Sequence, residues 1–96
     1  MNVLDHKKLA NFFNALSHPT RTMIVMELLR DKKCVNDIER LTKMKQPNIS
    51  QHLSILKTSN IVDCTRQGKR KCYFLKNRRL IKSIIGVLER QELGTG

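Results

Sequence analysis

The stretch from Met44 to Leu75 constrains this chain most, because an amphipathic helix is followed there at once by a strongly basic hairpin. The segment KQPNISQHLSILKTSNIV predicts a helix from about Gln46 to Thr58, with an apolar stripe at helical spacing formed by Ile49, Leu53 and Leu56. The segment DCTRQGKRKCYFL predicts two short strands around Gln67-Gly68-Lys69. Such a pair is typical of a winged helix-turn-helix, in which the helix enters the DNA major groove and the hairpin reaches the neighbouring backbone or minor groove.

The charge distribution supports a polyanionic partner. The 96 residues include 19 Lys and Arg against 8 Asp and Glu, for a formal net charge of +11. Between Lys43 and Lys82 the only acid is Asp63, whereas surfaces that are merely soluble usually mix both signs. The alternative is a basic RNA-binding or ribosome-associated domain, which would usually expose aromatic side chains for stacking. An enzyme is not expected, because the sequence contains no acid–base pair, nucleophile motif or phosphate loop.

Helical periodicity organises the rest of the chain into a single domain, residues 1–96, with one small core. We expect a first helix over residues 5–16, a buried second helix after Ser17-His18-Pro19, a turn at Asp31-Lys32-Lys33 and a short third helix. Asn77 can cap a last helix over residues 77–92. The predicted fold is therefore mostly α with a small β-hairpin wing, in the order α-α-α-α-β-β-α.

The two terminal helices carry strong apolar stripes, which are formed by Phe12, Phe13, Ile81, Ile84, Ile85 and Leu88. One small core cannot easily bury both stripes, so we expect them to form a homodimer interface; the alternative is that they cap the monomer's own core. A two-fold dimer also suits a reader of inverted repeats in double-stranded operator DNA, because half-sites one helical turn apart mirror the symmetry of the protein.

The exposed side of the helix after Lys45 predicts the base contacts. Gln51 lies opposite the apolar stripe, Asn48 lies at the edge of the exposed face, and Gln46 stands at the helix N-terminus, where it can meet phosphate. His52 lies closer to the stripe and is interpreted as partly buried and structural. The candidate DNA-binding residues are Gln46, Pro47, Asn48, Ser50 and Gln51 on the helix, with Arg66, Gln67, Gly68, Lys69 and Arg70 on the wing.

The cellular compartment that the sequence predicts limits the chemical states that its cysteines can adopt. No segment is apolar for long enough to span a membrane, and the N-terminus MNVLDHKKLA lacks the apolar region of a signal peptide. We therefore expect a cytoplasmic protein without a membrane partner. Cys34, Cys64 and Cys72 form an odd set, which disfavours a structural disulfide framework in a reducing compartment and leaves free, ligating or sensing thiols.

Each cysteine has a different setting. Cys34 begins a helix beside Lys32 and Lys33, so we expect it to be the most reactive thiol. Cys64 and Cys72 face each other if the hairpin is centred on Gly68, whereas a two-residue turn offsets them. The open alternatives are no cysteine sensor, thiol-redox or persulfide sensing, and metal or metalloid sensing.

Four segments resemble the ArsR/SmtB family of bacterial winged-helix repressors, and the likeness extends from about Leu4 to Leu88. The segments are ALSHPTRTMIVMELL, CVNDIERLT, QPNISQHLSILKTSNIV and RQGKRKCYFL. The resemblance implies a homodimer joined through the first and last helices, repression by covering a promoter, and an inducer that lowers DNA affinity. It also implies DNA contacts at Gln46, Pro47, Asn48, Ser50, Gln51 and the wing residues 67–70.

The sensory site of that family is altered here. Many relatives bind soft metals through a C-V-C-D box, and this chain reads Cys34-Val35-Asn36-Asp37, which keeps one thiolate. One thiolate is a poor chelator of a soft metal. The family's zinc-type site on the last helix needs Asp and His, and residues 76–92 contain neither. The metal site is therefore unknown, and a soft metal or metalloid ion held through cysteine is a candidate cofactor only.

Overall fold

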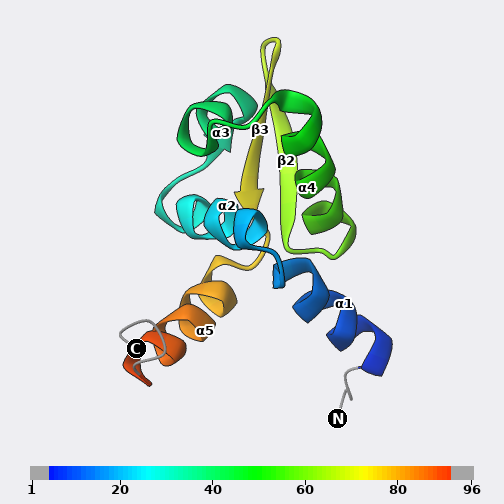
Figure 1. Cartoon of the computed structure of the whole chain (residues 1–96), viewed down its shortest axis with the longest axis vertical. Helices are drawn as coiled ribbons and strands as arrows, with labels where there is room; N and C mark the ends of the chain where they lie inside the picture. The colour runs from blue at the N-terminus through cyan, green and yellow to red at the C-terminus, as the bar shows by residue number, and fades with distance from the viewer. Residues whose placement is uncertain (1–4, 92–96) are drawn as a thin grey trace.

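The computed structural model describes residues 5–91 and shows a three-stranded antiparallel sheet with five helices around it (Figure 1). The ends of the predicted 1–96 domain, residues 1–4 and 92–96, lie outside the described residues. The elements in chain order are α1 (His6–Leu16), α2 (Pro19–Arg30), β1 (Lys33–Cys34), α3 (Val35–Thr42), α4 (Gln46–Thr58), β2 (Val62–Gln67), β3 (Arg70–Leu75) and α5 (Arg78–Arg90). The predicted winged helix-turn-helix with a small hairpin is confirmed.

The strand β1 is the element that the sequence did not predict. The sheet order is β1-β3-β2, and Lys33, which was expected in a turn, pairs with Tyr73 of β3. Two residues are too few to show the alternating pattern by which strands are predicted. The expectation of a turn at Lys33 was therefore wrong, because its conformation depends on a strand about forty residues further along the chain.

The hairpin has a two-residue turn, Gly68-Lys69, flanked by the Gln67–Arg70 pair. Gly68 has φ of +65°, a region that favours glycine and that a tight hairpin turn requires at this position. This turn length sets the register: Cys64 lies opposite Tyr73, and Cys72 lies opposite Thr65. The register in which Cys64 faces Cys72 is therefore wrong, and the offset alternative is the one observed.

The core lies between the sheet and the helices α2 and α4. The predicted stripe of α4 is confirmed, because Ile49, Leu53 and Leu56 are fully buried. They pack in one cluster with apolar side chains from α2, the hairpin and the start of α5, among them Ile24 and Ile81. Burial of each side chain of this size contributes about 1.5–3 kcal/mol to the free energy of unfolding. This cluster holds α4 in a fixed position beside the hairpin.

Hydrogen bonds at the helix ends define the boundaries. Asp5 and Asn77 accept backbone N–H groups at the starts of α1 and α5, as N-cap residues do. His18 caps α2, and its Nδ1 accepts from the backbone N–H of Thr20 at 3.1 Å. The buried Arg21 of α2 links this helix to α1, because its Nε donates to the carbonyl of Ala15 at 2.6 Å. Figure 1 shows that α1 and α5 diverge at the end of the molecule away from the hairpin tip.

None of the helices within residues 5–91 combines the length and the apolar character that crossing a bilayer requires.

Candidate nucleic-acid interface

The helices α3 and α4 form a helix-turn-helix. Lys43 ends α3 in the left-handed conformation with φ of +57°, and the chain re-enters a helix after Lys45. The apolar side of α4 is buried, so its opposite side is available to a partner. All five candidate residues of this helix are exposed: Gln46, Pro47, Asn48, Ser50 and Gln51. Amide and hydroxyl groups of these types can hydrogen-bond to base edges and to phosphates.

The wing carries its cations on a projecting tip. Figure 1 shows the β2–β3 hairpin extending beyond the helices at the end where α3 and α4 lie. The wing candidates Arg66, Gln67, Gly68, Lys69 and Arg70 are all exposed. The hairpin therefore presents positive charge at the same end of the molecule as the start of α4.

A pocket of about 270 Å³ joins α3, α4 and the wing. Gln46 lines it from α4, and the wing contributes cationic side chains from both strands and the turn. Three lining residues were not among the sequence candidates, namely Val35 and Asn36 at the start of α3 and Lys71 of the wing. Lys71 belongs to the basic run, which was a usable signal, whereas the only signal at Val35 and Asn36 was the Cys34-Val35-Asn36-Asp37 segment, which resembles the family's metal box.

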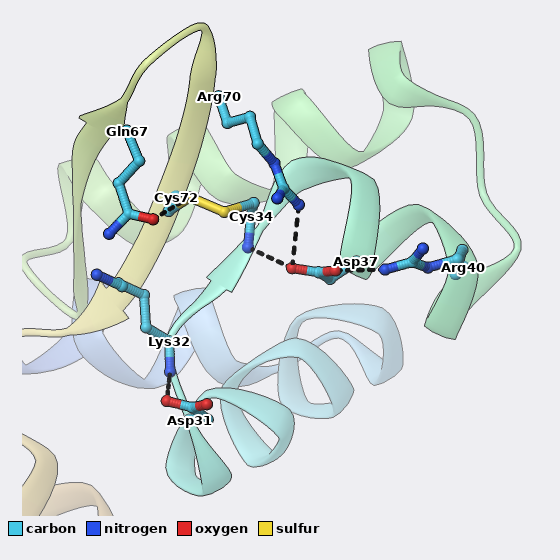
Figure 2. Close-up of a disulfide and its surroundings, with 8 residues drawn as sticks. All are labelled: Asp31, Lys32, Cys34, Asp37, Arg40, Gln67, Arg70 and Cys72. Atoms are coloured by element: carbon cyan, nitrogen blue, oxygen red, sulfur yellow. Dashed lines mark hydrogen bonds and ion pairs between the residues drawn. A yellow bond between two sulfur atoms is a disulfide. The ribbon is translucent and has the colours of Figure 1, made fainter.

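Asp37 places a carboxylate beside these cations, as Figure 2 shows. It accepts the backbone N–H of Cys34 at 2.9 Å, pairs with Arg40 at 2.5 Å, and lies 3.8 Å from Nη2 of Arg70. The Cys34 hydrogen bond, with the charges of Arg40 and Arg70, holds the pKa of Asp37 below its usual value although partial burial acts in the opposite direction. One candidate phosphate-binding arginine is therefore already paired with an acid.

Two of the three candidate sensor thiols form a disulfide. Cys34 and Cys72 are directly opposite in the β1–β3 pairing, and their sulfurs are bonded (Figure 2). The sequence did not predict this pairing, and Cys34, which was expected to be the most reactive thiol, is bonded to Cys72 in this state. The reason is the short strand β1, which brings Cys34 to Cys72. Cys64 is free and half-buried, and Nζ of Lys57 lies 3.5 Å from its sulfur.

The donor groups in this state do not suit a soft metal ion. Cys34 and Cys72 offer no thiolate while they are bonded to each other. Within residues 5–91, no three side chains of His, Cys, Asp or Glu gather closely enough to hold an ion.

The structure also brings the two terminal apolar stripes together. Ile81 is buried in the core, Phe12, Ile84 and Ile85 are half-buried, and Phe13 and Leu88 remain 58% and 42% exposed. All six line a pocket of about 260 Å³ between α1 and α5. Part of the stripes thus caps the monomer's own core, while the outer part stays uncovered.

Comparison with known proteins finds bacterial transcriptional regulators that are similar to this chain. Residues 18–63 match the model of the arsR family of bacterial regulatory proteins. The chain is 34% identical over 71 residues to the HTH-type transcriptional repressor SmtB of Mycobacterium tuberculosis; the match covers 74% of this chain and 53% of that relative, about half its length. It is 33% identical over 88 residues to the biofilm growth-associated repressor of Xylella fastidiosa, covering 88% of this chain and 77% of that protein.

A solved structure shows the same fold. The solution structure of the homodimeric winged helix-turn-helix DNA-binding domain of Mb0332 from Mycobacterium bovis superposes with a TM-score of 0.81. It covers 100% of this chain and 96% of that domain at 21% identity. The fold, the family model and the extensive match to the Xylella repressor agree, and this chain therefore belongs to the arsR family of bacterial regulatory proteins, whose members are transcriptional regulators and not enzymes.

Proposed function

We propose that this chain is a homodimeric transcriptional repressor that binds an inverted-repeat operator through α4 and the β2–β3 wing. The observation that carries this proposal is the exposed polar side of α4 beside the cationic wing, with Gln46 and the wing cations around one pocket. A helix of this kind fits the major groove, and wing cations neutralise phosphates of the flanking backbone.

The two elements have different roles in this proposal. Gln51 and Asn48 discriminate bases, because amide side chains pair well with adenine edges. Ser50 and Pro47 flank them, and Gln46 meets the backbone at the helix start. Arg66, Lys69 and Arg70 supply attraction without sequence preference, and Gln67 and Gly68 shape the turn that carries them.

The dimer is proposed to form through α1 and α5. The outer parts of their apolar stripes, including Phe13 and Leu88, are exposed in the single chain. Such an uncovered apolar surface commonly marks an interface between proteins. The Mb0332 domain is homodimeric, which supports a homodimer here, and the uncovered apolar stripes support an interface at α1 and α5. A two-fold dimer would place two copies of α4 on successive half-sites of an inverted repeat.

Release of the operator is proposed to depend on an inducer that acts through the cysteines. The Cys34–Cys72 bond favours thiol chemistry, because it links the start of α3 to the wing strand. A soft metal or metalloid ion is the second candidate, and it would require the bond to be reduced so that both sulfurs become thiolates. Titrating oxidised and reduced protein separately with cadmium or arsenite would distinguish thiol chemistry from ion binding. The ion candidate requires binding to the reduced protein, in which both sulfurs are free.

The test of operator binding compares a selected duplex with random duplex and structured RNA over a range of salt concentrations. We expect the duplex site to bind most tightly, with a slope of log affinity against log salt of about −0.9 for each phosphate contacted. Equal affinity for random RNA and for the selected duplex would contradict the proposal in favour of an RNA-binding domain.

Paired variants separate specificity from general attraction. Gln51→Ala should reduce the preference for the selected site by about 1–3 kcal/mol, whereas Thr58→Ala at the far end of α4 should leave it unchanged. Replacing Lys69 and Arg70 by Gln should weaken all duplexes alike and flatten the salt slope. Replacing Arg30 and Lys76, two exposed cations away from the wing tip, provides the control with the same charge change. Loss of specificity in the wing variant alone would reverse the assigned roles.

A further inference from the structure

Cys34, one half of the Cys34–Cys72 disulfide, lines the pocket that the wing cations also line. We propose that this pocket is a thiol–disulfide exchange site selective for small anionic thiols, meaning thiols that also carry a carboxylate. Its reaction cuts the covalent link between the start of α3 and the wing strand β3.

Burial indicates which sulfur is attacked. Cys34 lines the pocket and is 8% exposed, whereas Cys72 is fully buried. The pocket therefore gives an incoming thiolate access to the Cys34 side of the disulfide, whereas the Cys72 side is closed to a molecule of that size. Attack at Cys34 makes Cys72 the leaving group.

The exchange balances in two steps. A thiolate RS⁻ attacks Sγ of Cys34, the Cys34–Cys72 bond breaks, and its electron pair leaves on Cys72, which takes a proton from water. A second RS⁻ attacks the R-bearing sulfur of the mixed disulfide, forms RSSR and releases the Cys34 thiolate, which is then protonated. Two thiols are oxidised to one disulfide, and the protein disulfide is reduced to two thiols.

A neighbouring side chain can receive the leaving thiol. The side-chain oxygen Oε1 of Gln67 lies 3.8 Å from Sγ of Cys72, as Figure 2 shows. A buried thiolate is disfavoured, so Cys72 takes up a proton on leaving. The resulting S–H group can then donate to the Gln67 oxygen, which stabilises the reduced state.

Charge around the pocket selects the attacking thiol. Four cations line it: Arg66, Lys69, Arg70 and Lys71. The nearby acid is Asp37, whose charge is balanced by Arg40 and Arg70. The remaining positive field attracts a thiol that carries a carboxylate and repels one that carries an ammonium group.

The exchange has a structural consequence. The strand β1 has only two residues, and the disulfide is its single covalent bond to β3. Reduction leaves two ladder pairs to hold the start of α3 against the wing. If the wing binds operator phosphates as proposed above, the same cations serve both ligands, and bound operator should protect the disulfide from anionic thiols.

The first measurement is the rate at which oxidised protein is reduced by 3-mercaptopropionate, 2-mercaptoethanol and cysteamine, each normalised to its thiolate concentration. At about 0.01 M salt we expect the anionic thiol to react about tenfold faster than the cationic one, and the ratio to shrink at about 1 M salt. Mass spectrometry after mild oxidation should show the Cys34–Cys72 bond with Cys64 free. Equal normalised rates, or failure of Cys34 and Cys72 to form the bond, would overturn the proposal.

Matched variants localise the selectivity. The Lys69→Gln, Arg70→Gln double variant should lose most of the rate ratio, and the Arg30→Gln, Lys76→Gln control should keep it. If the ratio of the anionic to the cationic thiol rate is unchanged in the wing variant, the selectivity does not come from this pocket and the proposal is overturned. Operator protection is measured separately on the same protein. Selectivity in free protein without protection by operator would support the exchange site and contradict the placement of DNA over the wing.

Discussion

The guanidinium of Arg21 lies 3.3 Å from the imidazole of His52, measured from Nη1 to Nδ1. Arg21 also donates to the carbonyls of Ala15 and Asn14, so it connects the end of α1 with the helix that we propose reads DNA. Because guanidinium groups only donate hydrogen bonds, Nδ1 of His52 must act as the acceptor, and the ring is therefore neutral. Burial, the nearby ring of His18 and the charge of Arg21 all lower the pKa of His52.

This relationship predicts that acid destabilises the fold through His52. Its pKa in the folded state lies below the ordinary value of 6.5, so between the two values the unfolded chain binds more protons. The free energy of unfolding should therefore fall as the pH decreases from 6.5 through the folded pKa. In urea unfolding measured over that range, His52→Gln should show a weaker pH dependence, whereas His6→Gln, at an exposed histidine, should behave like wild type. An identical pH dependence in His52→Gln would contradict this assignment.

Arg21→Met should cost about 2–3 kcal/mol of folding stability, because the buried carbonyl of Ala15 and the partly buried carbonyl of Asn14 lose a charged donor. Methionine keeps most of the apolar stem, so the loss reports mainly on the hydrogen bonds. Arg30→Met, at an exposed arginine of the same helix, is the control and should change stability by less than about 0.5 kcal/mol. Urea unfolding compares the two; equal stabilities would show that the Arg21 contacts are replaced by water without cost.

Asp37→Asn should raise affinity for duplex DNA about threefold, because Arg70 loses its ion pair while the asparagine oxygen can still accept the N–H of Cys34. Glu39→Gln removes the same charge from the same helix without touching Arg70, so it corrects for the change in net charge. Fluorescence anisotropy with a labelled duplex measures both variants. An equal gain in the two would show that general charge, not release of Arg70, sets the affinity.

Placing acids on the uncovered part of the terminal stripes should separate the proposed dimer into monomers. Phe13 and Leu88 are exposed in the single chain, so the Phe13→Asp, Leu88→Asp variant should keep its helical circular dichroism spectrum and sediment as a monomer. Met26→Asp with Leu41→Asp changes two exposed apolar residues outside the pocket between α1 and α5. This control variant should remain dimeric. A dimeric interface variant would contradict assembly through α1 and α5.

The sequence by itself determined the elements whose signals are local. The stripe Ile49, Leu53 and Leu56 has helical period, so the buried side of α4 and its exposed polar side could be read directly. Gly68 within a basic run predicted the wing for a similar reason, since a tight turn needs the conformation that glycine adopts readily. These features depend on residues within a few positions of one another.

Only the tertiary structure decided which distant groups meet. Cys34 bonds to Cys72 because a two-residue strand aligns with β3, and Cys64 misses Cys72 because the hairpin turn has two residues instead of three. A one-residue change of register moves every strand side chain to the opposite face, and the sequence around Gly68 is compatible with either turn. The meeting of Asp37 with Arg70 depends on the same packing of α3 against the wing, a long-range arrangement that no local pattern encodes.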